Sequence, residues 1–120
     1  MEAQARQVAF YVDLTGKAHA QEWLDGLRNA EGRAAVKMRL LRAQRGLLGD
    51  CERYGQVTEL KIHHGPGYRV YGVEDGPVLV VLLCGGDKST QQKDFKKARR
   101  LAHEYQEEKS RGTIQLRRLP

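Results

Sequence analysis

Hydrophobic and polar residues follow a strand or helix pattern along most of this chain. Alternating or continuous apolar runs predict β-strands at 7–14, 57–63, 68–74 and 78–84. Apolar residues at helical spacing predict amphipathic helices at 17–27, 33–48 and 89–109. The predicted element order is therefore β-α-α-β-β-β-α.

The predicted strands are joined in a way that indicates one small sheet. Residues 65–67 and 75–77 have the glycine and proline content of tight turns, so the last three strands should form antiparallel hairpins. Segment 78–84 is apolar on both faces, which favours a central strand. The predicted fold class is α+β, with a small, mostly antiparallel sheet, a helical hairpin on one face and a C-terminal helix.

The length of 120 residues suits one compact domain over 1–120. We expect its core at about 7–106 and a basic tail at 110–120 that is mobile or docked on a partner. The longest apolar run, Val78–Cys84, is too short to cross a bilayer. The two cysteines have neither a metal-binding nor a disulfide-scaffold spacing, so a cytoplasmic location is expected.

A formal net charge of +6 indicates the kind of partner to expect. Basic proteins favour nucleic acid, an acidic protein or an anionic membrane surface. A basic surface that is simply solvated is the alternative interpretation.

Several basic and aromatic residues should meet on one face of the sheet. If the strands on either side of the first turn pair antiparallel, period-2 alternation places Lys61, His63, Arg69 and Tyr71 together. The apolar residues between them would then face the helices. Lys88 should lie beside this group, because it follows a predicted Gly-Gly turn at the end of the neighbouring strand.

This set of side chains suits cleavage of RNA without a metal or another cofactor. The ribose 2′-hydroxyl attacks the adjacent phosphorus, which requires a base, cations for the phosphorane and an acid for the leaving oxygen. Lys61 or His63 could act as the base, Arg69 could hold two phosphate oxygens, and Lys88 could add a second positive charge. Glu59 is expected at the edge of this face, with no carboxylate at its centre.

Other residues are candidates for binding RNA rather than cleaving it. Tyr68 or Tyr71 could stack on an unpaired base, although tyrosines on strands more often pack in a core. Polar side chains at the start of the last helix could bind the RNA backbone, or could form a solvated face. These residues are Gln91, Lys93, Lys96 and Lys97.

Two segments carry a resemblance to a known family. Gly65–Tyr71 and Leu82–Ala98 resemble the addiction module killer proteins, a phage-derived, HigB-like branch of the RelE/HigB toxins. These toxins belong to bacterial type II toxin–antitoxin systems, and the resemblance covers roughly residues 7–106. It implies a RelE/ParE-like fold and an endoribonuclease (mRNA interferase) that inhibits translation by cleaving mRNA on the ribosome. On that pattern Arg69 matches the family's strand arginine, and Lys61 and Lys88 match its basic positions.

The resemblance also implies partners. A cognate antitoxin, of the HigA-like helix-turn-helix type, would neutralise the toxin, and promoter DNA would be bound only through that complex. The ribosome and mRNA would be the targets, and no membrane would be involved.

One departure from the family pattern leaves the activity open. Several relatives carry a tyrosine or histidine near the start of the last helix or at the chain end, where this chain has Asp94 and Phe95. Either Tyr68, Tyr71 or His63 substitutes, or the chain is a ParE-like, non-enzymatic toxin that acts on DNA gyrase or another protein. A basic RNA- or protein-binding module without toxicity is the third interpretation.

Overall fold

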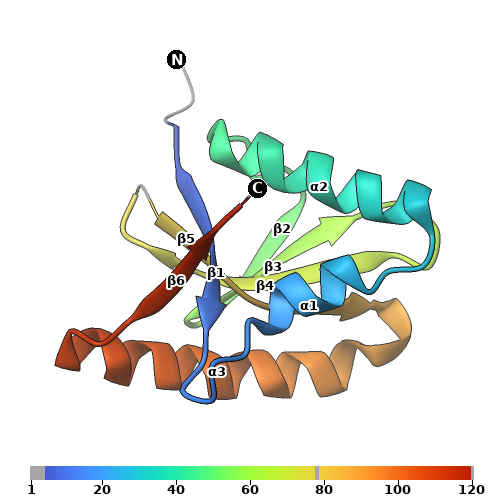
Figure 1. Cartoon of the computed structure of the whole chain (residues 1–120). Coiled ribbons are helices and arrows are strands. Elements are labelled where there is room, and N and C mark those ends of the chain that lie inside the picture. Colours follow the sequence, from blue (N-terminus) through green and yellow to red (C-terminus); the bar gives the residue numbers. More distant parts are fainter. Residues whose placement is uncertain (1–4, 78, 120) are drawn as a thin grey trace.

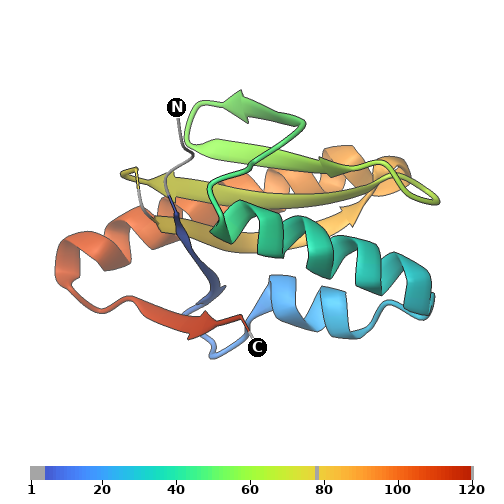
Figure 2. The ribbon, with the colours of Figure 1, turned by 90° about the horizontal axis from the view of Figure 1, so that it is seen from above.

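A mixed sheet with helices on both faces forms the protein. The computed structural model describes residues 5–77 and 79–119. The strands are β1 (Gln7–Val12), β2 (Cys51–Tyr54), β3 (Val57–Ile62), β4 (Tyr68–Asp75), β5 (Leu79–Asp87) and β6 (Gln115–Arg118). The helices are α1 (His19–Asp25), α2 (Ala30–Gln44), the short 3-10 helix η1 (Lys88–Thr90) and α3 (Gln91–Arg111). Helices α1 and α2 cover one face of the sheet and α3 crosses the other (Figures 1 and 2).

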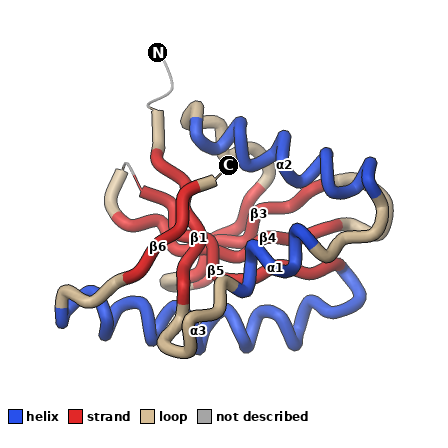
Figure 3. The backbone as a smooth tube through the Cα atoms, viewed as in Figure 1, coloured by secondary structure: helices blue, strands red, loops and turns tan. Residues whose placement is uncertain are grey.

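The six strands lie in the order β2-β3-β4-β5-β1-β6. Figure 3 shows the strands in red among the helices in blue. Strands β1 and β5 are parallel, and all other neighbours are antiparallel. The α+β class, the helical pair on one face and the mostly antiparallel sheet are therefore confirmed. No helix in the described part of the chain is long and apolar enough to cross a membrane.

Both edge strands differ from the prediction. The segment Gln115–Arg118 was expected within a mobile or partner-bound tail, but it pairs with β1, with Ala9 opposite Arg118 and Val12 opposite Gln115. All four residues of β6 are exposed, so backbone hydrogen bonds to β1, rather than burial of side chains, hold this strand in place. Strand β2, which pairs with β3, was not predicted either.

Two apolar layers pack against the two faces of the sheet. On one face Val8, Phe10 and Val12 of β1 join α1 and α2, which confirms the alternation predicted for this strand. On the other face α3 buries Leu101 and Tyr105 against β4 and β5. The polar Arg39 of α2 is only 8% exposed, and its guanidinium donates to the backbone oxygens of Lys61 (3.2 Å) and Asp50 (2.9 Å).

The predicted Gly-Gly turn is part of a strand. Strand β5 continues through Gly85 and Gly86 as far as Asp87. A Cβ atom at Gly85 would lie 2.3 Å from the Trp23 ring of α1, and one at Gly86 would lie 1.8 Å from the Asp94 carboxylate of α3. The two glycines therefore let α1 approach one face and the start of α3 approach the other.

This close approach predicts a specific loss of stability. The Gly85→Ala substitution places a methyl group against the Trp23 ring. Overpacking of this kind lowers the free energy of unfolding by roughly 1–3 kcal/mol. Urea denaturation of Gly85→Ala measures the loss. Gln92→Ala, an exposed change in α3, is the control and should stay within about 0.5 kcal/mol of the wild type. Equal midpoints for the two variants would show that Trp23 moves away freely.

Candidate functional site

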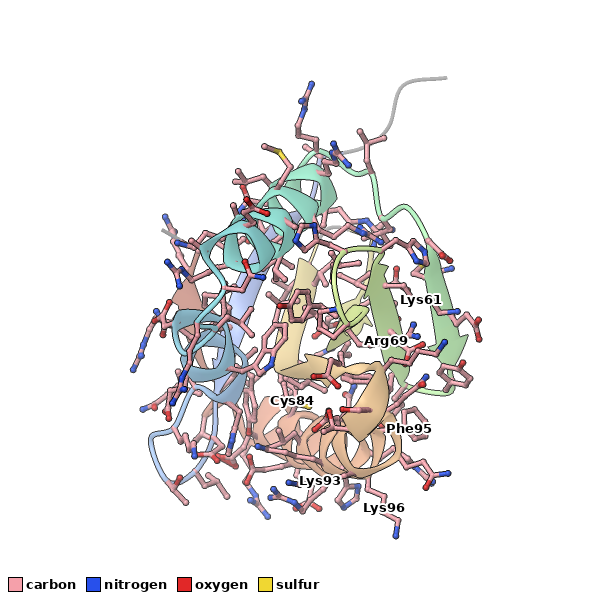
Figure 4. All side chains as sticks on the ribbon, turned by 90° about the vertical axis from the view of Figure 1, so that its right-hand side faces the viewer. Lys61, Arg69, Cys84, Lys93, Phe95 and Lys96 are labelled. Atoms are coloured by element: carbon pink, nitrogen blue, oxygen red, sulfur yellow. The ribbon has the colours of Figure 1, made fainter. Side chains whose placement is uncertain are left out.

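Lys61 and Arg69 lie directly opposite each other in the β3–β4 register. Both belong to the face that α3 partly covers, and their side chains are 20% and 12% exposed. Figure 4 shows the two residues close together, on the same side of the molecule as Phe95. The predicted antiparallel pairing and the shared face of these two cations are confirmed.

A buried carboxylate lies below the two cations. Glu59 is 1% exposed, and its Oε1 lies 3.9 Å from Nη1 of Arg69. The side-chain amide of Gln91, the first residue of α3, donates to Glu59 Oε2 at 3.0 Å. The expectation that Glu59 lies at the edge, with no carboxylate at the centre, is therefore wrong. Glu59 precedes Lys61 by two residues, so strand alternation alone was enough to place it on the same face.

The two tyrosines expected to contact RNA are both buried. Tyr71 lies opposite Glu59 and is 0% exposed; burial and the Glu59 carboxylate raise the pKa of its phenol. Tyr68 lies on the opposite face, 6% exposed, with its ring 6.0 Å from that of Trp23. Neither ring is available for a base to stack on, because each packs in one of the two cores.

His63 does not join Arg69 and Tyr71. It follows the end of β3, its side chain is 73% exposed, and its Nε2 lies 2.5 Å from Oδ2 of Asp50. The hydrogen bond between them lowers the pKa of Asp50. His63 also lines a groove with Met38 and Arg42 of α2, so it belongs to the side of the molecule that α2 covers.

Lys61 is held as a cation. Its ammonium donates to Glu52 on the neighbouring strand β2, and this bond raises the pKa of Lys61. The hydroxyl of Tyr54 donates to the same carboxylate. A charge stabilised in this way is suited to holding a phosphate oxygen rather than to removing a proton.

The remaining predicted residues are spread along η1 and α3. Lys88 is exposed at the start of η1. It lies beside the β3–β4 turn, because a Cβ atom added at Gly67 would be 3.6 Å from the Cβ of Lys88. Lys93 and Lys96 are exposed and lie away from Arg69 in Figure 4. Lys97 is half-buried and lies near enough to Cys84 to influence its thiol, whose pKa burial raises to about 12. Of the expected RNA-binding residues of α3, only Gln91 contacts the Glu59–Arg69 pair.

The described residues offer no obvious metal ligands. Within 5–77 and 79–119, no three histidine, cysteine, aspartate or glutamate side chains gather into a group that could hold an ion.

A bacterial relative places the chain in a family. The chain is 48% identical over 83 residues to a protein of Haemophilus influenzae that is described only as uncharacterized. The alignment covers 68% of this chain and 84% of the relative. The chain belongs to the family of this Haemophilus influenzae protein. No protein-family model matches the chain, and no solved structure matches it.

Membership of this family assigns no activity, because the relative has none assigned. The site itself consists of two paired cations, a buried carboxylate beneath them and an amide that fixes that carboxylate.

The buried carboxylate generates a stability prediction. Glu59→Gln keeps the side-chain shape but leaves the Arg69 guanidinium without its counter-charge, which should lower the free energy of unfolding by roughly 1–3 kcal/mol. Glu52→Gln is the matched control, because it breaks the exposed pair with Lys61 and should change stability little. Urea denaturation compares the two variants. A Glu52→Gln loss as large as that of Glu59→Gln would contradict a special role for the buried carboxylate.

Proposed function

We propose that this protein is the toxin of a type II toxin–antitoxin system and inhibits translation by metal-independent cleavage of mRNA on the ribosome. The observation that supports the proposal is the cation pair Lys61–Arg69 held over the buried Glu59. A phosphodiester that becomes a dianionic phosphorane needs positive groups fixed in advance at its oxygens. The resemblance to the RelE/HigB toxins points to the same residues.

The roles follow from the positions of the side chains. The planar guanidinium of Arg69 binds two phosphate oxygens, and the ammonium of Lys61 on the opposite strand neutralises further charge. Lys88 extends the positive region towards the β3–β4 turn. His63 lies on the side of the molecule that α2 covers rather than beside Arg69, so we assign it no role in proton transfer. The proposal rests on stabilisation of charge by Arg69 and Lys61.

The shallow site explains why the ribosome is needed. Arg69 and Lys61 lie on a sheet face rather than in a deep cleft, so the protein alone does little to orient the 2′-hydroxyl in line with the leaving oxygen. Holding reactants in a reactive geometry supplies several kcal/mol, on the order of 7–11 in the best cases. We assign that positioning to the ribosome.

A cognate antitoxin, of the HigA-like helix-turn-helix type, is the second partner. With a net charge of +6, the toxin favours an acidic or amphipathic segment that covers the cation pair. Promoter DNA would be bound through the antitoxin in the complex.

One observation favours a second candidate function. Tyr68 and Tyr71 are both buried, and the start of α3 carries Asp94 and Phe95 where relatives carry a tyrosine or histidine. A ParE-like toxin that binds DNA gyrase or another protein needs no such residue. In that case α3 and β6 would matter more than Arg69.

Induction of the wild type and of Arg69→Ala in bacteria, followed by mapping of RNA 5′ ends, tests the proposal. The wild type should arrest growth and create new mRNA 5′ ends in codon register. Loss of a group that stabilises the transition state lowers the rate on the order of 10²–10³-fold, so Arg69→Ala should abolish both effects. Lys93→Ala removes an exposed lysine that lies away from the site and should behave like the wild type.

Three results would count against the proposal in different ways. Arrest without new 5′ ends, unchanged in Arg69→Ala, would favour the gyrase interpretation, and plasmid supercoiling would then be measured. Arrest that Lys93→Ala relieves as fully as Arg69→Ala would show that general positive charge, rather than this site, is responsible. Absence of arrest would favour a binding module without toxicity.

A further inference from the structure

A groove opens between the edge strand β2 and α3, on the sheet face that carries Lys61 and Arg69. It has a volume of about 610 Å³. Its floor includes Val57 and Ala102, which are 2% and 1% exposed, and its walls include the aromatic rings of Tyr54 and Phe95. The centroids of the two rings are 5.2 Å apart, and the ring planes meet at 75°, an edge-to-face contact.

Tyr54 differs from every other tyrosine of the chain. It is 42% exposed, whereas the remaining four tyrosines are at most 6% exposed. It ends a four-residue strand of which three residues are exposed. Packing of the core therefore accounts for one edge of the Tyr54 ring, at Phe95, and leaves a large part of the ring facing solvent.

An arginine and a histidine line the mouth of this groove. Arg99 and His103 project from α3 beside the two aromatic rings, and both are exposed. An exposed aromatic ring next to an arginine is the arrangement on which unpaired bases stack in proteins that bind single-stranded nucleic acid. The positive residues on the exposed side of α3, including Lys96 and Arg100, favour a polyanion over a neutral ligand.

One carboxylate links the groove to Lys61 of the cation pair. This residue, Glu52, accepts from both the Tyr54 hydroxyl and the Lys61 ammonium. The ring and the ammonium thus lie on either side of a single side chain. A nucleotide whose phosphate rests on Lys61 and Arg69 can reach Tyr54 with a neighbouring base.

We propose that the groove between Tyr54 and Phe95 binds an unpaired nucleobase of the RNA strand whose phosphate is held at Lys61 and Arg69. This inference rests on the proposed function and names the subsite that would select the base. Tyr54 is its stacking platform, Phe95 fixes the angle of that ring, and Arg99 and His103 contact the adjoining backbone.

Binding of a short, fluorescein-labelled, single-stranded RNA with 2′-O-methyl riboses tests the proposal with the purified full chain. The methyl groups block attack by the 2′-hydroxyl, so anisotropy reports binding alone. Loss of one base–aromatic stack weakens binding roughly 5- to 150-fold, which is the change expected for Tyr54→Leu. Tyr54→Phe keeps the ring and loses only the bond to Glu52, so it should bind within about twofold of the wild type.

The salt dependence separates stacking from charge. The slope of log Kd against log salt counts the phosphates neutralised by cations, so Tyr54→Leu should leave it unchanged while Arg99→Ala reduces it. An unfolded variant would lose affinity and salt slope together, which differs from either expected result. Circular dichroism checks the fold of each variant. If Tyr54→Leu does not fold, 2-aminopurine placed at successive positions of the oligonucleotide reports stacking on the wild type directly: one quenched position is expected, and uniform fluorescence overturns the proposal.

Further outcomes distinguish a failure of the base subsite from a failure of the proposed mRNA cleavage. Equal affinities for Tyr54→Leu and wild type, with growth arrest and new 5′ ends retained, reject the base subsite but not the cleavage. If a co-expressed antitoxin no longer neutralises Tyr54→Leu while RNA binding is unchanged, the groove binds a peptide segment of the antitoxin instead of a base. A wild type that binds the oligonucleotide through Tyr54 yet creates no new 5′ ends would reject cleavage and leave the subsite in place.

Discussion

The close packing of two helices on opposite sides of one strand end sets the geometry of the site. At Gly85 and Gly86 the central strand β5 has no side chains, so Trp23 of α1 contacts one face and Asp94 of α3 contacts the other. This approach fixes where α3 begins. Because α3 begins there, Gln91 reaches Glu59, and Glu59 in turn lies under Arg69. The position of the guanidinium thus depends on two glycines in another strand.

The pair formed by Glu59 and Arg69 is better understood as a positioning device than as a source of stability. A charge taken out of water is costly, and a buried pair often stabilises a fold no more than apolar residues of similar volume would. Here the Nη1–Oε1 distance is 3.9 Å, and the Nε of Arg69 and the Oε1 of Glu59 are buried without a hydrogen-bond partner. A guanidinium whose donors are incompletely satisfied retains the capacity to bind the oxygens of a phosphate.

Much of the fold was predictable, and the exceptions share a physical cause. Strands β3 and β4 and their pairing followed from alternation and from the glycine-rich turn, which placed Lys61 opposite Arg69. Strands β2 and β6 were missed because their four residues each are mostly exposed, so backbone pairing rather than an apolar pattern defines them. The same omission hid Tyr54, because a tyrosine outside any predicted element cannot be assigned to a face.

The burial of Tyr71 and the position of Glu59 represent a different kind of error. Alternation correctly placed Tyr71 on the face of Arg69, but it does not show how far α3 covers that face. The helix covers the half of the face towards β5 and leaves the half towards β2, so exposure differs between side chains of this face: Tyr71 is 0% exposed, Arg69 12% and Tyr54 42%. The exposed aromatic ring on β2 marks the part of this face that a ligand can reach. The chemistry of the face should therefore be sought between Arg69 and β2, where the charge and the accessible ring lie together, and not at its centre.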